Sequence, residues 1–153
     1  MKYVYILMMV SLVIICAYAA IADEINEYYN EVLMPTINIV NTDIEKMSRL
    51  ISEAIYSPLL DETLRVEASK AYKNVNEQYW IIVKSKPPLK LRGVKKIALN
   101  HFRAVKEIFA MATARDFFTA EKMSDFFDLI DKAKGYTFEI ESEYQKVARE
   151  FEN

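Results

Sequence analysis

The sequence predicts an all-α protein, and three observations support this prediction. The 153 residues include only two glycines and four prolines, which leaves little material for the tight turns of a β-fold. Apolar residues recur at spacings of three and four along four long segments. The connections between these segments are short. Because each apolar stripe must be buried and short connections make neighbours antiparallel, we expect an up-down-up-down four-helix bundle.

The four helices are expected over residues 24–57, 62–84 and 89–114, and from just after Thr119 to residue 151. Pro35 should kink the first helix without ending it, because the apolar phase is the same on both sides of it. Asp61 and Thr119 are expected N-caps, and Gly135 should lie inside the fourth helix.

The first and fourth helices are predicted to be the longest. At about 1.5 Å per residue they reach roughly 50 Å, whereas the middle two stay under about 40 Å. The surplus length should form a two-helix stalk beside the chain termini. Its aromatic residues would be Tyr28, Tyr29, Tyr144 and Phe151.

Residues 3–22 form an apolar run broken only by Ser11, for which two interpretations stay open. As a signal peptide, the run would be cleaved at one of two A-x-A patterns, Ala17-Tyr18-Ala19 or Ala20-Ile21-Ala22. As an uncleaved signal anchor, its 20 residues are about the number that crosses a bilayer core. In both interpretations residues 1–22 precede a single domain at residues 23–153, and this domain is expected to be extracytoplasmic. Cys16 follows Ile15 where a lipobox needs a small residue, so no lipid is assigned to it.

The composition of residues 23–153 argues against most enzyme chemistry. His101 is the only histidine and this region has no cysteine, which excludes thiolate metal sites and Cys-His nucleophile pairs. The residue three before His101 is Ala98, so the Glu-x-x-His pattern of di-iron bundles is missing. A net charge of −2 gives no general attraction to nucleic acid. We therefore expect a non-enzymatic protein without a metal or cofactor.

A basic segment surrounds the connection between the second and third helices. No acidic residue lies between Glu77 and Glu107, and the basic residues nearest the connection are Lys84, Lys86, Lys90, Arg92, Lys95 and Lys96. They predict either a surface for anionic lipid or an acidic cell-surface polymer, or pairing with the acids of the stalk. Those acids are Glu24, Glu27, Glu31, Glu139, Glu141 and Glu143. The helix lengths put the basic residues about 10 Å or more behind the stalk tip, beyond a Debye length near 8 Å.

One alternative makes His101 an axial haem ligand, with Met34 or Met47 as the second ligand. A histidine beside a core stripe is far more often a hydrogen-bonded packing residue, and we favour that interpretation. The other methionines and the aromatics are first interpreted as core packing, and a cavity for a small apolar ligand among them is the alternative. These residues are Tyr79, Trp80, Met111, Phe117, Phe118, Met123, Phe126 and Phe127.

Three short segments carry a resemblance: Ala22-Asp23, Pro87-Pro88 and Tyr144-Gln145-Lys146. With them the chain resembles exported four-helix bundles typified by the periplasmic b-type cytochrome of that fold. It is also similar to small secreted helical proteins of unknown function in which a Pro-Pro pair leads into a helix containing histidine, here His101. The resemblance implies a bundle but no haem, because Tyr28 and Tyr29 stand where the methionine ligand is expected and the last helix ends without histidine.

Together these features predict an exported, non-enzymatic helical bundle that acts as a binding or structural module at the cell surface. Its expected partner is a surface protein or an anionic surface polymer, and residues 3–22 are the expected membrane attachment if they are retained. The alternative is a carrier of a small apolar ligand or cofactor within the bundle.

Overall fold

The computed structural model describes residues 2–57 and 60–151, and within them the side chains of residues 2–12, 14 and 15 are not described. The elements in order are α1 (Lys2–Glu27), the π-helical turn η1 (Tyr28–Leu33), α2 (Met34–Ala54), α3 (Asp61–Lys84), the 3-10 turn η3 (Leu89–Leu91), α4 (Arg92–Ala112) and α5 (Ala120–Arg149). No strand occurs in these residues. The predicted all-α class and the four-helix bundle are confirmed.

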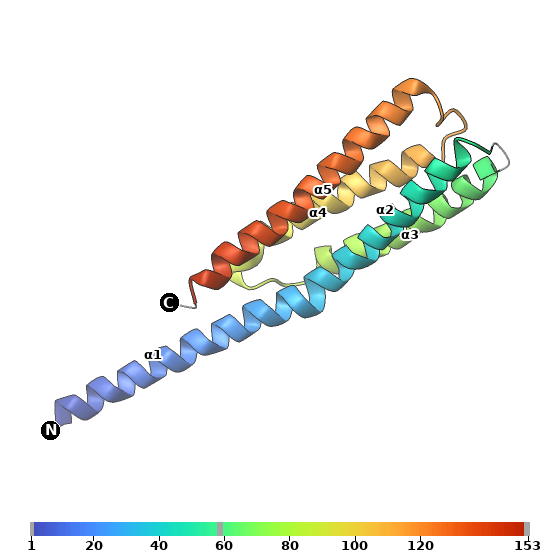
Figure 1. Ribbon diagram of the computed structural model, residues 1–153. Helices are drawn as coiled ribbons and strands as arrows, with labels where there is room; N and C mark the ends of the chain where they lie inside the picture. The colour runs from blue at the N-terminus through green and yellow to red at the C-terminus, as the bar shows by residue number, and fades with distance from the viewer. Residues whose placement is uncertain (1, 58–59, 152–153) are drawn as a thin grey trace.

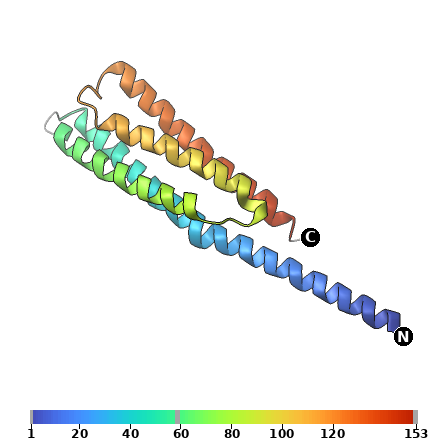
Figure 2. The ribbon, with the colours of Figure 1, turned by 180° about the vertical axis from the view of Figure 1, so that it is seen from behind.

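Helices α2, α3, α4 and α5 lie side by side, and each packs along the next one in sequence (Figure 1). Helix α1 continues the line of α2 and projects beyond the other three helices. The carboxyl end of α5 lies close to the point where α1 leaves the bundle, in both views (Figure 2). One end of the molecule therefore carries the projecting helix and the end of the chain, whereas the opposite end consists of turns.

The core is built from the apolar stripes that the three-four spacing predicted. Each large apolar side chain buried there contributes about 1.5–3 kcal/mol relative to an exposed one. Bulky rings fill the half of the core nearer the turns. Fully buried side chains include Leu33, Ile37, Met47, Ile51, Leu64, Ile82, Phe102, Phe109, Phe117 and Phe126.

The helix passes Pro35 without a break, as predicted, but it first widens into the π-turn η1. Pro35 has no N–H to donate to the carbonyl of Glu31, so the preceding turn loses one α-helical bond. Met34 instead donates its backbone N–H to the carbonyl of Tyr29, five residues back. The hydroxyl of Thr36 donates to the carbonyls of Val32 and Leu33, at 3.1 and 2.7 Å. The π-turn thus replaces the bonds that proline removes.

Several predicted helix ends move by a few residues. Asp61 is the first residue of α3 rather than its N-cap, and its carboxylate pairs with Arg65 one turn later at 3.4 Å. The segment after Pro88 begins as the 3-10 turn η3, so α4 starts at Arg92 and not at residue 89. Thr119 is the N-cap of α5, as predicted. Gly135 lies inside α5, whose 30 residues make it longer than α2, α3 and α4.

Candidate functional site: the basic end of the bundle

A pair of tyrosines joins the start of the bundle to its last helix. The rings of Tyr29 in η1 and Tyr144 in α5 stack with centroids 3.4 Å apart and planes 3° apart. The hydroxyl of Tyr144 donates to Asn26 Oδ1 at 2.7 Å. Both rings are buried, and burial raises the pKa of Tyr29. These contacts bring together the two predicted stalk helices at the predicted tyrosines.

The loop between α3 and α4 packs against the same junction. Ser85 Oγ donates to the carbonyl of Ile82 at 2.7 Å and accepts a hydrogen bond from the hydroxyl of Tyr28, also at 2.7 Å. Lys95 Nζ donates to the carbonyls of Val83 and Ser85, at 2.9 and 2.7 Å. A cation at the carboxyl end of a helix stabilises it, because the terminal carbonyls lack partners within the helix. Because both hydrogen bonds go to backbone carbonyls at this helix end, Lys95 stabilises the loop structure, and burial lowers its pKa.

Most of the predicted basic residues have no acidic partner among the residues that the structure describes. Lys90 Nζ pairs with Glu150 Oε2 at 2.6 Å, and this bond raises the lysine's pKa. Glu150 is not one of the predicted stalk acids. The predicted pairing with those acids is not found in the part of the chain that the structure describes, where Glu143 pairs with Lys146. The cations that are exposed and form no ion pair with a described acid are Lys84, Lys86, Arg92 and Lys96. We call these four residues the free basic cluster.

The turn at Pro88–Lys90 reaches the level of the stalk tip, so the prediction that the basic residues lie behind that tip is wrong for Lys90. A pocket of about 380 Å³ is lined on one side by Tyr18 and Ile21 of α1 and on the other by Leu89, Lys90 and Phe151. The cause is the extended backbone between α3 and η3, where Ser85 and Pro88 have ψ of 150°. Extended residues advance about 3.1 Å each, twice the helical rise. Helix lengths alone therefore placed the loop too far back.

This end of the molecule is also apolar at its rim. Tyr18 and Phe151 contact each other with ring centroids 5.9 Å apart. Leu89, at the turn after the two prolines, leaves 72% of its surface exposed. The sequence analysis did not single out Leu89, although its position outside the three-four spacing of the third helix was a usable signal. Free cations and exposed apolar side chains thus meet at the end from which α1 projects.

His101 is a packing residue in the structure, as favoured. It is fully buried, and its Nδ1 lies 3.0 Å from the carbonyl oxygen of Ala133. That oxygen can only accept, so Nδ1 carries the proton and Nε2 is the acceptor. Among described groups Nε2 has no hydrogen-bond partner. Burial lowers the pKa of His101, which keeps the ring neutral.

His101 and Met34, the alternative haem ligands, are not brought together by any contact that the structure describes. Met34 lies in the first turn of α2, partly buried against the core. Neither it nor His101 lines any of the three pockets described in this section. No group of three or more His, Cys, Asp or Glu side chains within the described ranges is placed to hold a metal ion.

The aromatic residues considered for a cavity form two separate groups of ring contacts, and the phenylalanine group lies at the far end of the bundle. Phe117 contacts both Phe118 and Phe126 edge to face, with ring centroids 5.1 and 5.2 Å apart. Phe126 contacts Phe127 in the same way at 5.6 Å. On α3, Tyr79 contacts Trp80, and Lys106 Nζ lies 5.1 Å from the Tyr79 ring centroid. These rings fill space at the helix ends.

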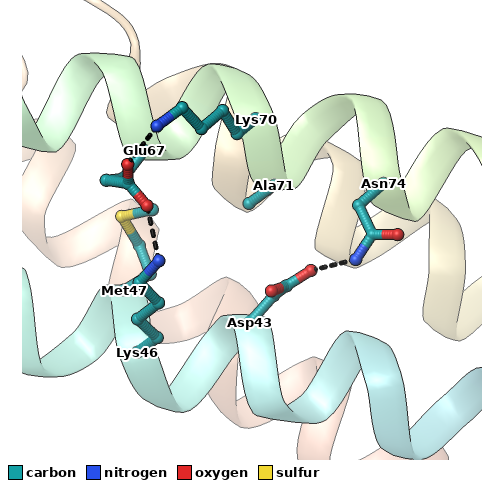
Figure 3. A pocket seen from close by; sticks show the side chains of 7 residues that line it. All are labelled: Asp43, Lys46, Met47, Glu67, Lys70, Ala71 and Asn74. Carbon is teal, nitrogen blue, oxygen red and sulfur yellow. Dashed lines mark hydrogen bonds and ion pairs between the residues drawn. The ribbon is translucent and has the colours of Figure 1, made fainter.

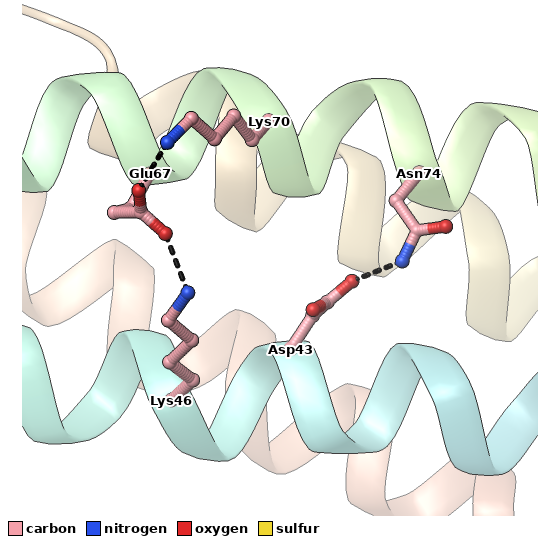
Figure 4. Close-up of polar contacts among 5 residues, drawn as sticks. All are labelled: Asp43, Lys46, Glu67, Lys70 and Asn74. Carbon is pink, nitrogen blue, oxygen red and sulfur yellow. Dashed lines mark hydrogen bonds and ion pairs between the residues drawn. The ribbon is translucent and has the colours of Figure 1, made fainter.

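A polar pocket of about 170 Å³ lies between α2 and α3 and was not foreseen (Figure 3). Glu67 of α3 accepts hydrogen bonds from Lys46 of α2 at 2.5 Å and from Lys70 at 2.6 Å, which lower its pKa to about 2. Asn74 Nδ2 donates to Asp43 Oδ2 at 2.6 Å (Figure 4). Because every charged group in the pocket except Asp43 pairs with an opposite charge, and Asp43 accepts from an amide, the pocket is a contact that fixes α2 against α3. None of the charged side chains that line this pocket is left without a polar partner to bind a ligand.

A more apolar groove of about 370 Å³ lies between α2 and α5. Ile44 and Ile130 line it, and Phe138 stands at its edge with 74% of its surface exposed. Phe138 lies outside the predicted stripe of the fourth helix, so the periodicity gave no reason to expect an aromatic ring here. The groove is the second surface of the bundle that offers apolar contact.

No family model, curated protein or solved structure matches the chain. The resemblance to exported cytochrome-like bundles and small secreted helical proteins therefore stays a prediction. Where side chains are described, none of the helices combines the length and apolarity needed to cross a membrane. Much of the run 3–22 lies outside those residues.

Proposed function

We propose that the protein is an exported, non-enzymatic bundle of the up-down-up-down type that keeps residues 3–22 as a membrane anchor. In this proposal it serves as a binding or structural module at the cell surface. The single observation that carries the proposal is that α1, η1 and α2 are continuous from Lys2 to Ala54. The apolar run thus enters the bundle without a flexible connection.

The ends of the apolar run support its role as an anchor. Its 20 residues correspond to about 30 Å of helix, the thickness of a bilayer core. Lys2 precedes the run, and the first basic residue after it is Lys46. This asymmetry favours a cytoplasmic amino terminus and an extracytoplasmic bundle. Tyr18, near the end of the run, packs against Phe151, so removal of the run would expose an apolar part of the bundle.

Membrane extraction and intact mass test this proposal together. We expect the expressed chain to stay in the membrane pellet after alkaline carbonate treatment and to have the mass of a chain that starts at Met1. Leu12→Arg with Val13→Arg should release it, because each arginine at the centre of a spanning helix costs about 2.5–3.5 kcal/mol. A soluble chain that starts at Asp23 would show a cleaved signal peptide and would contradict the anchor.

A second candidate function, the carrier of a small apolar ligand, is favoured by the groove between α2 and α5. Ile44, Ile130 and Phe138 would contact the ligand there, at the surface rather than inside the core. Native mass spectrometry of the purified chain tests it. A bound ligand should appear as added mass that Phe138→Ser removes, and a chain at its bare mass without absorbance beyond that of its aromatic residues would count against a carrier.

A further inference from the structure

We propose that the basic end of the bundle docks on an anionic lipid surface, with the free basic cluster at the headgroups and Leu89 at the boundary of the acyl region. This inference rests on the proposed function, since α1 would hold the bundle at that membrane. The inference extends that function by naming the surface that the bundle contacts and the lipid charge that this contact requires.

The register between α1 and the loop carries the argument. Residues 18–25 of α1 share a pocket with Pro88, Leu89 and Lys90. The apolar run ends at Ala22, inside this interval. A helix that spans a bilayer with residues 3–22 therefore brings the loop to the membrane–water boundary. Tyr18 would then stand at the interface, where tyrosine is enriched in membrane proteins.

The charges at this end suit anionic lipid. Lys84, Lys86, Arg92 and Lys96 are exposed and form no ion pair with a described acid. They come from the last turn of α3, the loop and the first turns of α4. Cations within a Debye length of an anionic surface are attracted to it. The register with α1 places the turn at Pro88–Lys90 inside that distance, and Lys86 and Arg92 lie two residues from this turn along the chain. Each is expected to contribute about fivefold to the docking equilibrium.

The apolar contribution comes from Leu89. It leaves 72% of its surface exposed beside two prolines that hold the backbone extended. Exposed Leu89 next to free cations gives this end both kinds of contact that an interfacial segment uses. A soluble acidic polymer would use the cations but would give Leu89 no apolar environment, so we favour lipid.

Two glycines offer matched positions for a probe. A side chain at Gly93 or at Gly135 would meet no atom within 4 Å. Gly93 lies between Arg92 and Lys96 in the basic end, whereas Gly135 lies within α5, away from that end. Gly93→Cys or Gly135→Cys, each combined with Cys16→Ser, can be labelled with a nitrobenzoxadiazole dye whose emission shifts to the blue in an apolar environment.

The full chain is reconstituted into nanodiscs of phosphatidylcholine alone or of a roughly three-to-one mixture with phosphatidylglycerol. We expect the probe at Gly93 to shift to the blue only in the anionic discs and to return when salt is raised to about 1 M, where the Debye length is about 3 Å. The probe at Gly135 should give the same emission in both. Neutralising the free basic cluster to Gln should weaken docking by two to three orders of magnitude at about fivefold per cation.

The charge control neutralises four exposed cations elsewhere: Arg49, Lys73, Arg115 and Lys132. This control variant should dock normally. The proposal would be overturned if both quadruple variants lost docking equally, or if the Gly93 probe had the same emission in neutral and anionic discs. Neither result would contradict the anchor. A response to soluble polyphosphate but not to anionic discs would assign the surface to an acidic polymer instead. A chain that fails to co-purify with any disc would remove the anchor and the docking together.

Discussion

Single residues in this protein mainly stabilise contacts between helices. The clearest case is His101, whose Nδ1–H joins α4 to the Ala133 carbonyl of α5. Sequence reasoning identified it as packing, because it flanks an apolar stripe with no patterned partner. It could not reveal that Nε2 has no hydrogen-bond partner among the described groups, since that depends on the side chains of the facing helix.

Replacing His101 should change the stability of the protein rather than a binding activity. His101→Ala removes a buried ring and one donor, and we expect it to cost about 2–4 kcal/mol in the free energy of unfolding. His101→Asn, whose amide can donate in place of Nδ1–H, should cost less. Urea denaturation of both variants tests the order, and a folded His101→Ala chain that had lost a bound molecule would contradict the packing role.

The same histidine predicts a pH dependence. Its pKa is lower in the folded state than the value of about 6.5 in the unfolded chain, so below that pH the unfolded state binds more protons. His101 should therefore destabilise the fold as pH falls through 6.5, by at most about 1.4 kcal/mol per pH unit. The difference in unfolding free energy between wild type and His101→Asn, measured between pH 7.5 and 5.5 at roughly half-unit intervals, should decrease as the pH is lowered. A flat difference would show that the ring does not titrate.

Glu67 allows a second test at this scale. Hydrogen bonds from Lys46 and Lys70 lower its pKa to about 2. Lys46→Ala should raise that pKa toward its ordinary value, and NMR titration of the carboxyl carbon measures it. Lys73→Ala, on the same helix but without an ion pair to a described acid, is the control and should leave the pKa of Glu67 unchanged.

Among the helices, the junction of α1, η1 and α5 was the hardest to predict. The three-four spacing indicated each helix and the continuity past Pro35, because helical periodicity is a local property of the sequence. It could not indicate the π-turn. That turn depends on how Tyr28 and Tyr29 pack against α5 and the α3–α4 loop, which are distant in sequence. The stalk tyrosines were identified, but the loop beside them was placed too far back.

Tyr144 tests how strongly this junction is held together. Tyr144→Phe keeps the stacked ring and loses the hydrogen bond to Asn26, which should cost about 0.5–1.5 kcal/mol. Hydrogen exchange should rise in residues 26–33 more than in the core of α4. Tyr136→Phe is the matched control in the same helix and should leave exchange unchanged. Uniformly faster exchange in Tyr144→Phe would mean that the junction unfolds only with the whole bundle.

For the whole molecule, the two ends have different character. One end consists of turns packed with phenylalanine rings, and the other combines free cations, Leu89 and the projecting α1. Sequence alone located the basic segment and the apolar run, but it did not show that the turn at Pro88–Lys90 lies at the level where the run ends. That level depends on the loop between α3 and η3, in which Ser85 and Pro88 are extended. The groove between α2 and α5 was equally hidden, since periodicity predicts which faces are buried but not how closely two helices approach.

The most direct test of the membrane-anchored account uses Cys16, the only cysteine in the chain. We expect a membrane-impermeant maleimide to leave Cys16 unlabelled in intact cells and to label it after detergent solubilisation. In a Cys16→Ser background, Tyr56→Cys at the far end, where the native side chain is 89% exposed, should react in intact cells. A chain in which Cys16 reacts without detergent, or from which Cys16 has been removed, would contradict the anchored bundle.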